Sequence, residues 1–137
     1  MTDASDALSV AAAGLRAQSA RMRIIAENIA NANSTAETPD GDPYRRQVPV
    51  FESELDRATG METVRMSRAT PDMSDFRMVH EPGHPAANDD GYVRYPNVQT
   101  LVELMDMREA QRSYEANLNM VESSRRMMER ALDLLRR

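Results

Sequence analysis

The positions of the prolines constrain this chain more than any other feature of its sequence. All seven lie between residues 39 and 96, whereas residues 1–38 and 97–137 contain none. Proline lacks a backbone N–H and clashes with the preceding helical turn, so the middle of the chain cannot form a long helix. Long helices are therefore expected at the two ends, with short elements between them.

Residues 4 to about 33 form the first expected helix. Asp3 and Asp6 stand at N-cap and N3 spacing, near the positive end of the helix dipole. Large residues recur every seven positions with small ones between them, as in a seam against another helix. The large residues are Leu8, Leu15, Met22 and Ile29, and the small ones are Ala12, Ser19 and Ala26. The poor helix formers at 31–35 are expected to end the helix.

The second expected helix covers residues 97–136 and opens after Pro96, with Asn97 as its N-cap. A heptad pattern runs along it, interrupted by Gln111 and Arg125. Its apolar and aromatic members are Leu104, Met107, Tyr114, Leu118, Val121, Met128, Leu132 and Leu135.

The middle of the chain, residues 34–96, is expected to be a small β-rich or largely extended insert. Glycines 41, 60 and 91 are expected in turns. Strand patterns occur at 47–51, 62–67, 76–79 and 92–95.

The expected fold class is mainly α with this small β-rich or extended insert. Residues 1–33 and 97–137 are expected to pair as a discontinuous, coiled-coil-like inner domain, and residues 34–96 form the second part.

Both expected helices carry more apolar surface than one helix pair can cover. The last third of the second helix has Met, Leu, Val and Ala around a wide arc, and the first adds Val10, Ile24 and Ile25 beside its seam. A helix that is apolar over so much of its circumference needs neighbours on several sides. Assembly with other chains is therefore predicted. The alternative is a compact bundle in which the insert folds over the helices.

Composition excludes several classes. The net charge is −5, which disfavours nucleic acid as the main partner, since phosphate binding needs a concentrated basic patch. There is no cysteine, so disulfides and thiolate metal sites are absent. The sequence contains no run of 18 apolar residues. Its acidic start does not resemble a cleavable signal peptide, so any export is expected to occur without one.

Two short motifs invite a metal interpretation. His80 and His84 are four residues apart with Glu81 beside the first, as in a zinc-binding helix, but Pro82 and the residues after it forbid a regular helix. The stretch 88–91 (Asn-Asp-Asp-Gly) lacks the distant glutamate of a calcium loop and is expected to be a turn. Neither a nucleophile elbow nor a phosphate-binding glycine loop is present. No catalytic residue, metal or cofactor is predicted.

Several stretches resemble a known family. Residues 25–33 (Ile-Ala-Glu-Asn-Ile-Ala-Asn-Ala-Asn) resemble the N-terminal signature of bacterial flagellar rod, hook and hook-associated axial proteins. Residues 103–107 (Glu-Leu-Met-Asp-Met), followed by Ala110, Arg112, Tyr114, Ala116 and Asn117, resemble their C-terminal signature. Stretches 41–46, 81–85, 90–93 and 95–98 are similar to the proximal rod proteins within it.

The resemblance implies a non-enzymatic structural subunit of the flagellar basal body. Such proteins are exported uncleaved and polymerise in the periplasm into the helical tube that carries torque from the membrane ring to the distal rod and hook. The implied partners are copies of the chain, other rod proteins, the rod-to-membrane-ring adaptor and the export gate, with no nucleic acid and no membrane span. The expected assembly interface comprises Leu8, Leu15, Met22, Asn28, Ile29, Asn31, Leu104, Met107, Arg112, Tyr114, Asn117, Leu118, Val121, Met128, Leu132 and Leu135.

Two rival classes differ from this in measurable ways. A coiled-coil adaptor or secreted effector that binds one partner helix-in-groove would give a closed, stoichiometric complex instead of an extended array. A small metal-dependent enzyme built on His80 and His84 would contain stoichiometric bound metal.

Overall fold

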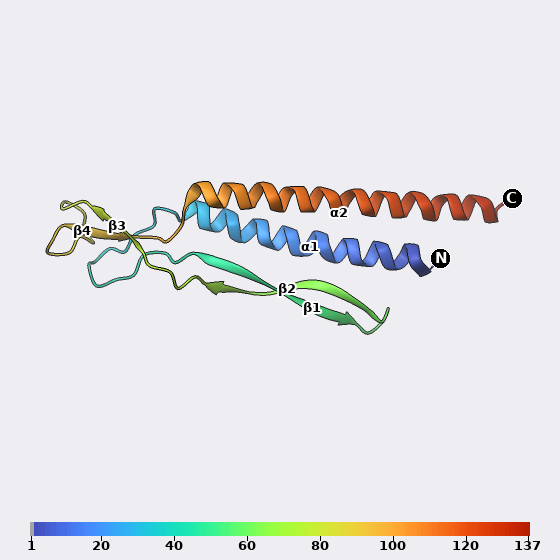
Figure 1. The fold of residues 1–137 in the computed structure, drawn as a ribbon, viewed down its shortest axis with the longest axis horizontal. Helices are drawn as coiled ribbons and strands as arrows, with labels where there is room; N and C mark the ends of the chain where they lie inside the picture. The colour runs from blue at the N-terminus through green and yellow to red at the C-terminus, as the bar shows by residue number, and fades with distance from the viewer. Residues whose placement is uncertain (1) are drawn as a thin grey trace. The chain divides into compact units, whose positions relative to one another are not determined.

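A computed structural model describes residues 2–137, with the side chain of Thr2 left out. The element order is α1 (Thr2–Ala30), β1 (Gln47–Asp56), β2 (Met61–Pro71), β3 (Arg77–His80), β4 (Tyr92–Tyr95) and α2 (Thr100–Leu135), as Figure 1 shows. The expected mainly helical fold with a small β insert is confirmed. The four expected strands are present, and the first two extend further than their apolar patterns suggested.

The chain divides into two compact units, and α1, α2 and the β1–β2 hairpin each contribute to both. The first unit comprises residues 1–22, 50–68 and 108–137, and the second comprises residues 23–49 and 69–107. This division cuts across the expected boundaries near residues 33 and 97.

In the first unit, α1 and α2 run side by side in opposite directions (Figure 1). Arg21 of α1 lies 3.6 Å from Glu109 of α2. About two turns back along α1, a Cβ on Gly14 would lie 2.7 Å from Oδ1 of Asn117. The Asn117 side chain of α2 therefore packs directly on Gly14, and a side chain at position 14 would have to displace it.

The buried line of each helix lies one residue beside the expected seam. On α1 it includes Gly14, Ala17, Ile24 and Asn28. On α2 it is the heptad Glu103, Ala110, Asn117, Ser124 and Ala131, of which the third and fifth are half-buried. The expected register was therefore wrong for the pairing within the chain, because the closest approach of two helices selects small residues and not the largest ones.

In the first unit, β1 and β2 form a hairpin. Ser67 donates its hydroxyl to the Val50 carbonyl, and Thr63 donates to that of Glu54. Gly60 closes the turn at φ +74°, in the left-handed region that its expected turn position requires.

In the second unit, β3 pairs antiparallel with β4, with Val79 opposite the fully buried Val93. Gly91, at φ +82°, lies in the turn before β4, as expected. Gly41 lies in a turn closed by its own N–H and the carbonyl of Thr38.

The end of α1 agrees with the sequence expectation, but neither expected N-cap is observed. The first helix ends at Ala30, where the Asn31 side chain donates to the exposed carbonyl of Glu27 at 2.8 Å. Asp3 lies inside the first turn and is not the N-cap. Asn97 is not the N-cap of α2, because the helix begins at Thr100 and the Asn97 side chain is bonded elsewhere. Asn97 therefore bonds to tertiary partners instead of capping a helix.

Candidate functional site

A network of polar side chains occupies the second unit, and it begins at Asn28 near the end of α1. Asn28 is buried, and its amide nitrogen donates to the Gln47 carbonyl at 2.8 Å. Its amide oxygen accepts from the Gln47 backbone N–H at 2.9 Å and from the Tyr44 hydroxyl at 2.7 Å. One side chain thus satisfies both backbone groups of Gln47 and fixes the start of β1 against α1.

Tyr44 is held inside this network. Burial raises the pKa of its hydroxyl, and the negative charges of Glu27 and Glu103 raise it further. The hydroxyl therefore stays protonated at neutral pH and acts as a hydrogen-bond donor to Asn28.

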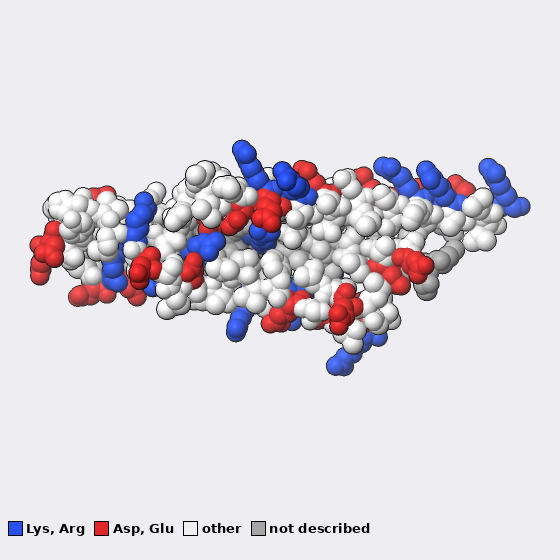
Figure 2. Space-filling model, in the orientation of Figure 1, with Lys and Arg blue, Asp and Glu red and all other residues white. Residues whose placement is uncertain are grey.

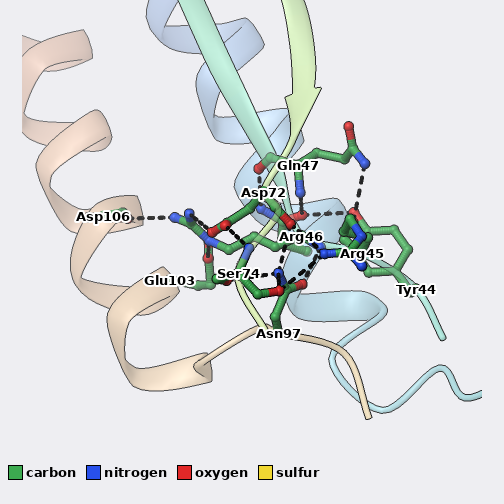
Figure 3. A network of polar contacts seen from close by, with 10 residues as sticks. Tyr44, Arg45, Arg46, Gln47, Asp72, Ser74, Asn97, Glu103 and Asp106 are labelled. Atoms are coloured by element: carbon green, nitrogen blue, oxygen red, sulfur yellow. Dashed lines mark hydrogen bonds and ion pairs between the residues drawn. The ribbon is translucent and has the colours of Figure 1, made fainter. Parts of the chain in front are cut away.

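Asn97 connects the ends of the hairpin to the approach to α2. Its amide oxygen accepts from the Arg46 backbone N–H at 2.8 Å, directly before β1. Its nitrogen donates to the carbonyls of Asp72 and Ser74, which follow β2, at 2.9 and 3.2 Å. Figure 3 shows Asn97 beneath these residues. Both strands of the hairpin are therefore tied at one end by a single side chain.

The Arg46 guanidinium forms the charged centre of the network. Its Nε donates to Glu103, its Nη1 lies 3.2 Å from Asp72, and its Nη2 lies 3.7 Å from Asp106 (Figure 3). Burial lowers the Arg46 pKa, but the hydrogen bond and charge of Glu103, followed by those of Asp72, outweigh that effect and raise it. Arg46 is thus a permanent cation that joins the hairpin to the start of α2.

Asp72 is fixed by its own neighbours. The backbone N–H of Ser74 donates to Asp72 Oδ1 at 2.9 Å. That bond, the Ser74 side chain and then Arg46 hold the pKa of Asp72 below its usual value, against a smaller opposing effect of burial.

The network holds segments of the second unit together. Its donors and acceptors are directed at backbone groups and at each other, which fixes three segments that are distant in the sequence.

The second candidate surface is an apolar stripe on α2. The heptad expected as the seam lies beside the buried line, so its large residues are exposed or half-exposed. Leu132, for example, is 51% exposed. We call this surface the α2 stripe; it consists of Leu104, Met107, Tyr114, Leu118, Val121, Met128, Leu132 and Leu135.

The expected interface residues separate into groups. Asn28, Asn31 and Asn117 make hydrogen bonds within the chain, to Gln47, Glu27 and Ser113 respectively. Arg112 is exposed on α2. The residues of the α1 heptad are half-buried: Leu8, Leu15, Met22 and Ile29.

The sequence reading did not identify the charged half of the network. Arg46 and Glu103 lie in the stretches 41–46 and 103–107 that resemble the family, but the sequence predicted no role for either residue or for Asp72. The sequence does contain one indication of this site: Glu103 begins a heptad that continues with the small residues Ala110, Ser124 and Ala131, a pattern typical of a close helix contact. A glutamate on such a line requires a cation from another segment.

The two motifs with possible metal chemistry are structural here. His80 lies in β3, with its ring edge-on to Tyr92 at 4.9 Å between centroids. His84 accepts the Ala86 N–H at Nδ1 and lies 3.2 Å from the Thr35 hydroxyl through Nε2. Asn88 accepts the Tyr92 N–H in the expected turn. Among residues 2–137, no group of three or more potential ligand side chains is placed to hold a metal ion.

Hydropathy gives one further limit. In the described part of the chain, neither helix has a stretch long and apolar enough to cross a membrane.

Helices from opposite ends of one chain, tied by a polar network around the buried Asn28 and Glu103 and carrying an exposed apolar stripe, are typical of a structural assembly protein. Comparisons with known proteins agree with this class. Residues 8–36 match the family model "Flagella basal body rod protein", and residues 89–134 match "Flagellar basal body rod FlgEFG protein C-terminal". The network joins these two matched segments through residues 44–47.

Relatives that match over nearly the whole chain identify the family more closely than the two family models do. The chain is 47% identical over 136 residues to the flagellar basal-body rod protein FlgC of Agrobacterium fabrum, covering 99% of this chain and 98% of that one. It is 37% identical to FlgC of Aquifex aeolicus (97% and 98% covered) and 38% identical to that of Salmonella typhimurium (91% and 92%). The chain belongs to the FlgC family of flagellar basal-body rod proteins.

This membership confirms the prediction of a structural rod subunit that is not an enzyme.

Proposed function

We propose that this chain polymerises with copies of itself and with other rod proteins into the helical tube of the proximal rod. In this role it transmits torque from the membrane ring to the distal rod and hook. Family membership supports the rod assignment, and the surface of α2 supports the mode of assembly.

The α2 stripe is the observation that carries the proposal. Burying a Leu or Met side chain contributes about 1.5–3 kcal/mol, and the stripe leaves several of them wet. Meanwhile the buried apolar set consists mainly of alanines, with Ile24, Ile25, Val93 and Val98 as its larger members. So small a core gives modest stability to a single chain. Packing another helix on the stripe adds what the isolated chain lacks.

In the proposed arrangement, residues 1–33 and 97–137 form a coiled-coil-like inner part of the tube. Residues 34–96 face outward or contact neighbours. The residues expected at the interface from the sequence are retained as the proposed contact set, except that Asn28, Asn31 and Asn117 support it from within the chain. The α2 stripe is the face of α2 that lies beside its buried line and stays exposed or half-exposed when α1 and α2 pair.

Torque passes through several helix contacts at once, so no single interface carries the load. The ion network resists shear between α2 and the hairpin, because sliding would separate Arg46 from the buried carboxylate of Glu103.

The proposed location is the periplasm, reached through the flagellar export apparatus without a cleaved signal. The rod-to-membrane-ring adaptor and the export gate are proposed neighbours. Helices with little buried apolar surface are marginal before assembly, which suits passage through a narrow channel.

Electron microscopy of basal bodies tests the proposal. A strain lacking the gene is expected to lose the rod, and the wild-type gene restores it. Leu118→Gln with Leu132→Gln removes two residues of the stripe and is expected to abolish rod assembly while the protein is still produced.

The matched control is Leu55→Gln on the hairpin, a residue that is 58% exposed and outside the stripe. It is expected to leave the rod intact. Complete rods in the Leu118/Leu132 variant, or in the deletion strain, contradict the proposal.

A further inference from the structure

One carboxylate oxygen in the polar network has no partner. Glu103 is buried with 1% of its side chain exposed, and its Oε1 accepts from Arg46. Its Oε2 is buried without a hydrogen-bond donor among the described residues. A buried carboxylate oxygen without a donor costs free energy, so it marks a position where a donor is missing.

Glu103 lines a cleft of about 240 Å³. The cleft is roomy enough for a side chain and not merely for one water molecule. Its lining includes Arg46, Asp72, Ser74, Asn97, Val102 and Glu103. Figure 3 shows Glu103 and Asp106, one turn apart on α2, both pointing toward Arg46.

The charge of this site is unbalanced. Glu103, Asp72 and Asp106 surround the guanidinium of Arg46, and the guanidinium of Arg45 donates to the carbonyls of Asp72 and Ser74 nearby. Three carboxylates against two cations leave an excess of one negative charge. The first turn of α2 contributes roughly half a positive charge through the helix dipole, which offsets only a part. A further cation is therefore attracted to the cleft.

Positively charged residues, which complement the negative charge of the cleft, follow the C-terminal end of α2. Arg136 and Arg137 come directly after the last helical residue, Leu135, and both are exposed. Figure 2 shows basic side chains at this end of α2. Leu134 and Leu135 beside them are exposed, as is Leu101 beside the cleft, so each site has a charged group with apolar neighbours.

We infer that the cleft at Glu103 receives the guanidinium of Arg136 or Arg137 from a second copy of this chain. The planar fork of arginine donates several N–H groups at once, so it can serve Glu103 Oε2 together with Asp106. All 17 basic residues of the chain are arginine, which makes arginine the cation that a second copy presents. The contact joins different surfaces of two copies, so it does not close on itself and can repeat along a filament.

This inference rests on the proposed function, since it requires copies that meet in the rod. It adds a polar, directional contact to the apolar packing of the α2 stripe. The α2 stripe supplies area, and the cleft supplies direction and register.

Disulfide trapping between full-length copies tests it, because the chain has no cysteine of its own. One copy carries Val102→Cys in the cleft and the other carries Leu135→Cys beside the arginines, so every charge is kept. A disulfide requires the two Cα atoms to approach within about 7 Å. The matched control pairs Leu135→Cys with Val64→Cys, since Val102 and Val64 are both 42% exposed.

The Val102–Leu135 pair is expected to cross-link about tenfold faster than the control under mild oxidation, since charge attraction accelerates encounter. Raising the salt to about 1 M, where the screening length falls to about 3 Å, is expected to remove most of that excess. The same loss of excess rate is expected from Asp106→Asn in the first copy, and from Arg136→Ser with Arg137→Ser in the second. Asp106 is chosen because it is partly exposed and its replacement leaves the buried Arg46–Glu103 pair in place.

Equal rates for the two cysteine pairs overturn the inference. So does an excess that survives both the Asp106 and the arginine substitutions, since an apolar contact alone then explains it. If rods still depend on Leu118 and Leu132 in that case, the rod proposal stands and only the cleft contact fails.

Discussion

The guanidinium of Arg46 donates through Nε to Oε1 of Glu103, whose side chain is almost fully buried in the first turn of α2. Arg46 lies directly before β1, so this ion pair joins segments that are 57 residues apart. Asp72 and Asp106 also lie against the Arg46 guanidinium, so the cation of this pair has three carboxylates around it.

Glu103→Gln is expected to destabilise the chain by about 3–5 kcal/mol, because it leaves a partly buried guanidinium without its closest carboxylate. The measurement is the free energy of unfolding from urea titration. Glu109→Gln is the matched control on the same helix: its carboxylate is exposed and lies 3.6 Å from Arg21. An exposed pair contributes about 0–1 kcal/mol. Equal losses for the two variants contradict the role given to Glu103.

Asn28→Ala is expected to cost more than Tyr44→Phe. The first leaves the N–H and carbonyl of Gln47 without partners, at about 1–3 kcal/mol for each buried group. The second removes one hydroxyl, a loss of about 0.5–1.5 kcal/mol. Urea midpoints of the two variants give the comparison. A larger loss for Tyr44→Phe refutes the assignment of Asn28 as the anchor of β1.

Gly14→Ala is expected to destabilise the helix pair by about 1–3 kcal/mol, although alanine favours helix more than glycine. The added Cβ would lie 2.7 Å from Oδ1 of Asn117. Thermal melting of Gly14→Ala, of Asn117→Ala and of the double variant forms a complete cycle. The double variant is expected to recover most of the loss from Gly14→Ala, since the clashing amide is gone. A stabilised single Gly14→Ala variant rules out close contact at this point.

Acid is expected to loosen the second unit through Asp72. The folded state holds the Asp72 pKa below its ordinary value of 3.8, chiefly through hydrogen bonds from Ser74 and also through Arg46. Its contribution is therefore complete above about pH 4 and is lost as the pH falls through the lower folded pKa. Carboxyl NMR titration of Asp72 measures this directly. In the Asp72→Asn variant, the unfolding free energy is expected to fall less steeply with acid than in the wild type.

The ends of the chain could be predicted from sequence because their signal is local. Proline restricts the backbone at its own position and one turn before, so confinement of all seven prolines to residues 39–96 predicted where long helices form. The strand patterns at 76–79 and 92–95 are local in the same way, and the structure places strands at 77–80 and 92–95.

The register of the helices and the polar network required the tertiary structure. The heptad patterns that contain Leu8 and Leu15 on α1 and Leu118 on α2 are as regular as those of a helix–helix seam. The buried lines nevertheless run through Gly14 on α1 and Asn117 on α2. Periodicity gives a spacing but not which of two adjacent stripes another helix covers, and that choice depends on how closely the backbones approach. Asn97 likewise has the chemistry of an N-cap, but Arg46 and Ser74 compete for its side chain.

The sequence by itself determined the element types, the helical ends with the insert between them, and the family, since these depend on local propensity and on recognisable motifs. Only the tertiary structure decided which stripe of α2 is covered and which carboxylates surround Arg46. The physical reason is that burial and ion pairing depend on distances between segments far apart in the chain, and one-dimensional patterns do not contain those distances.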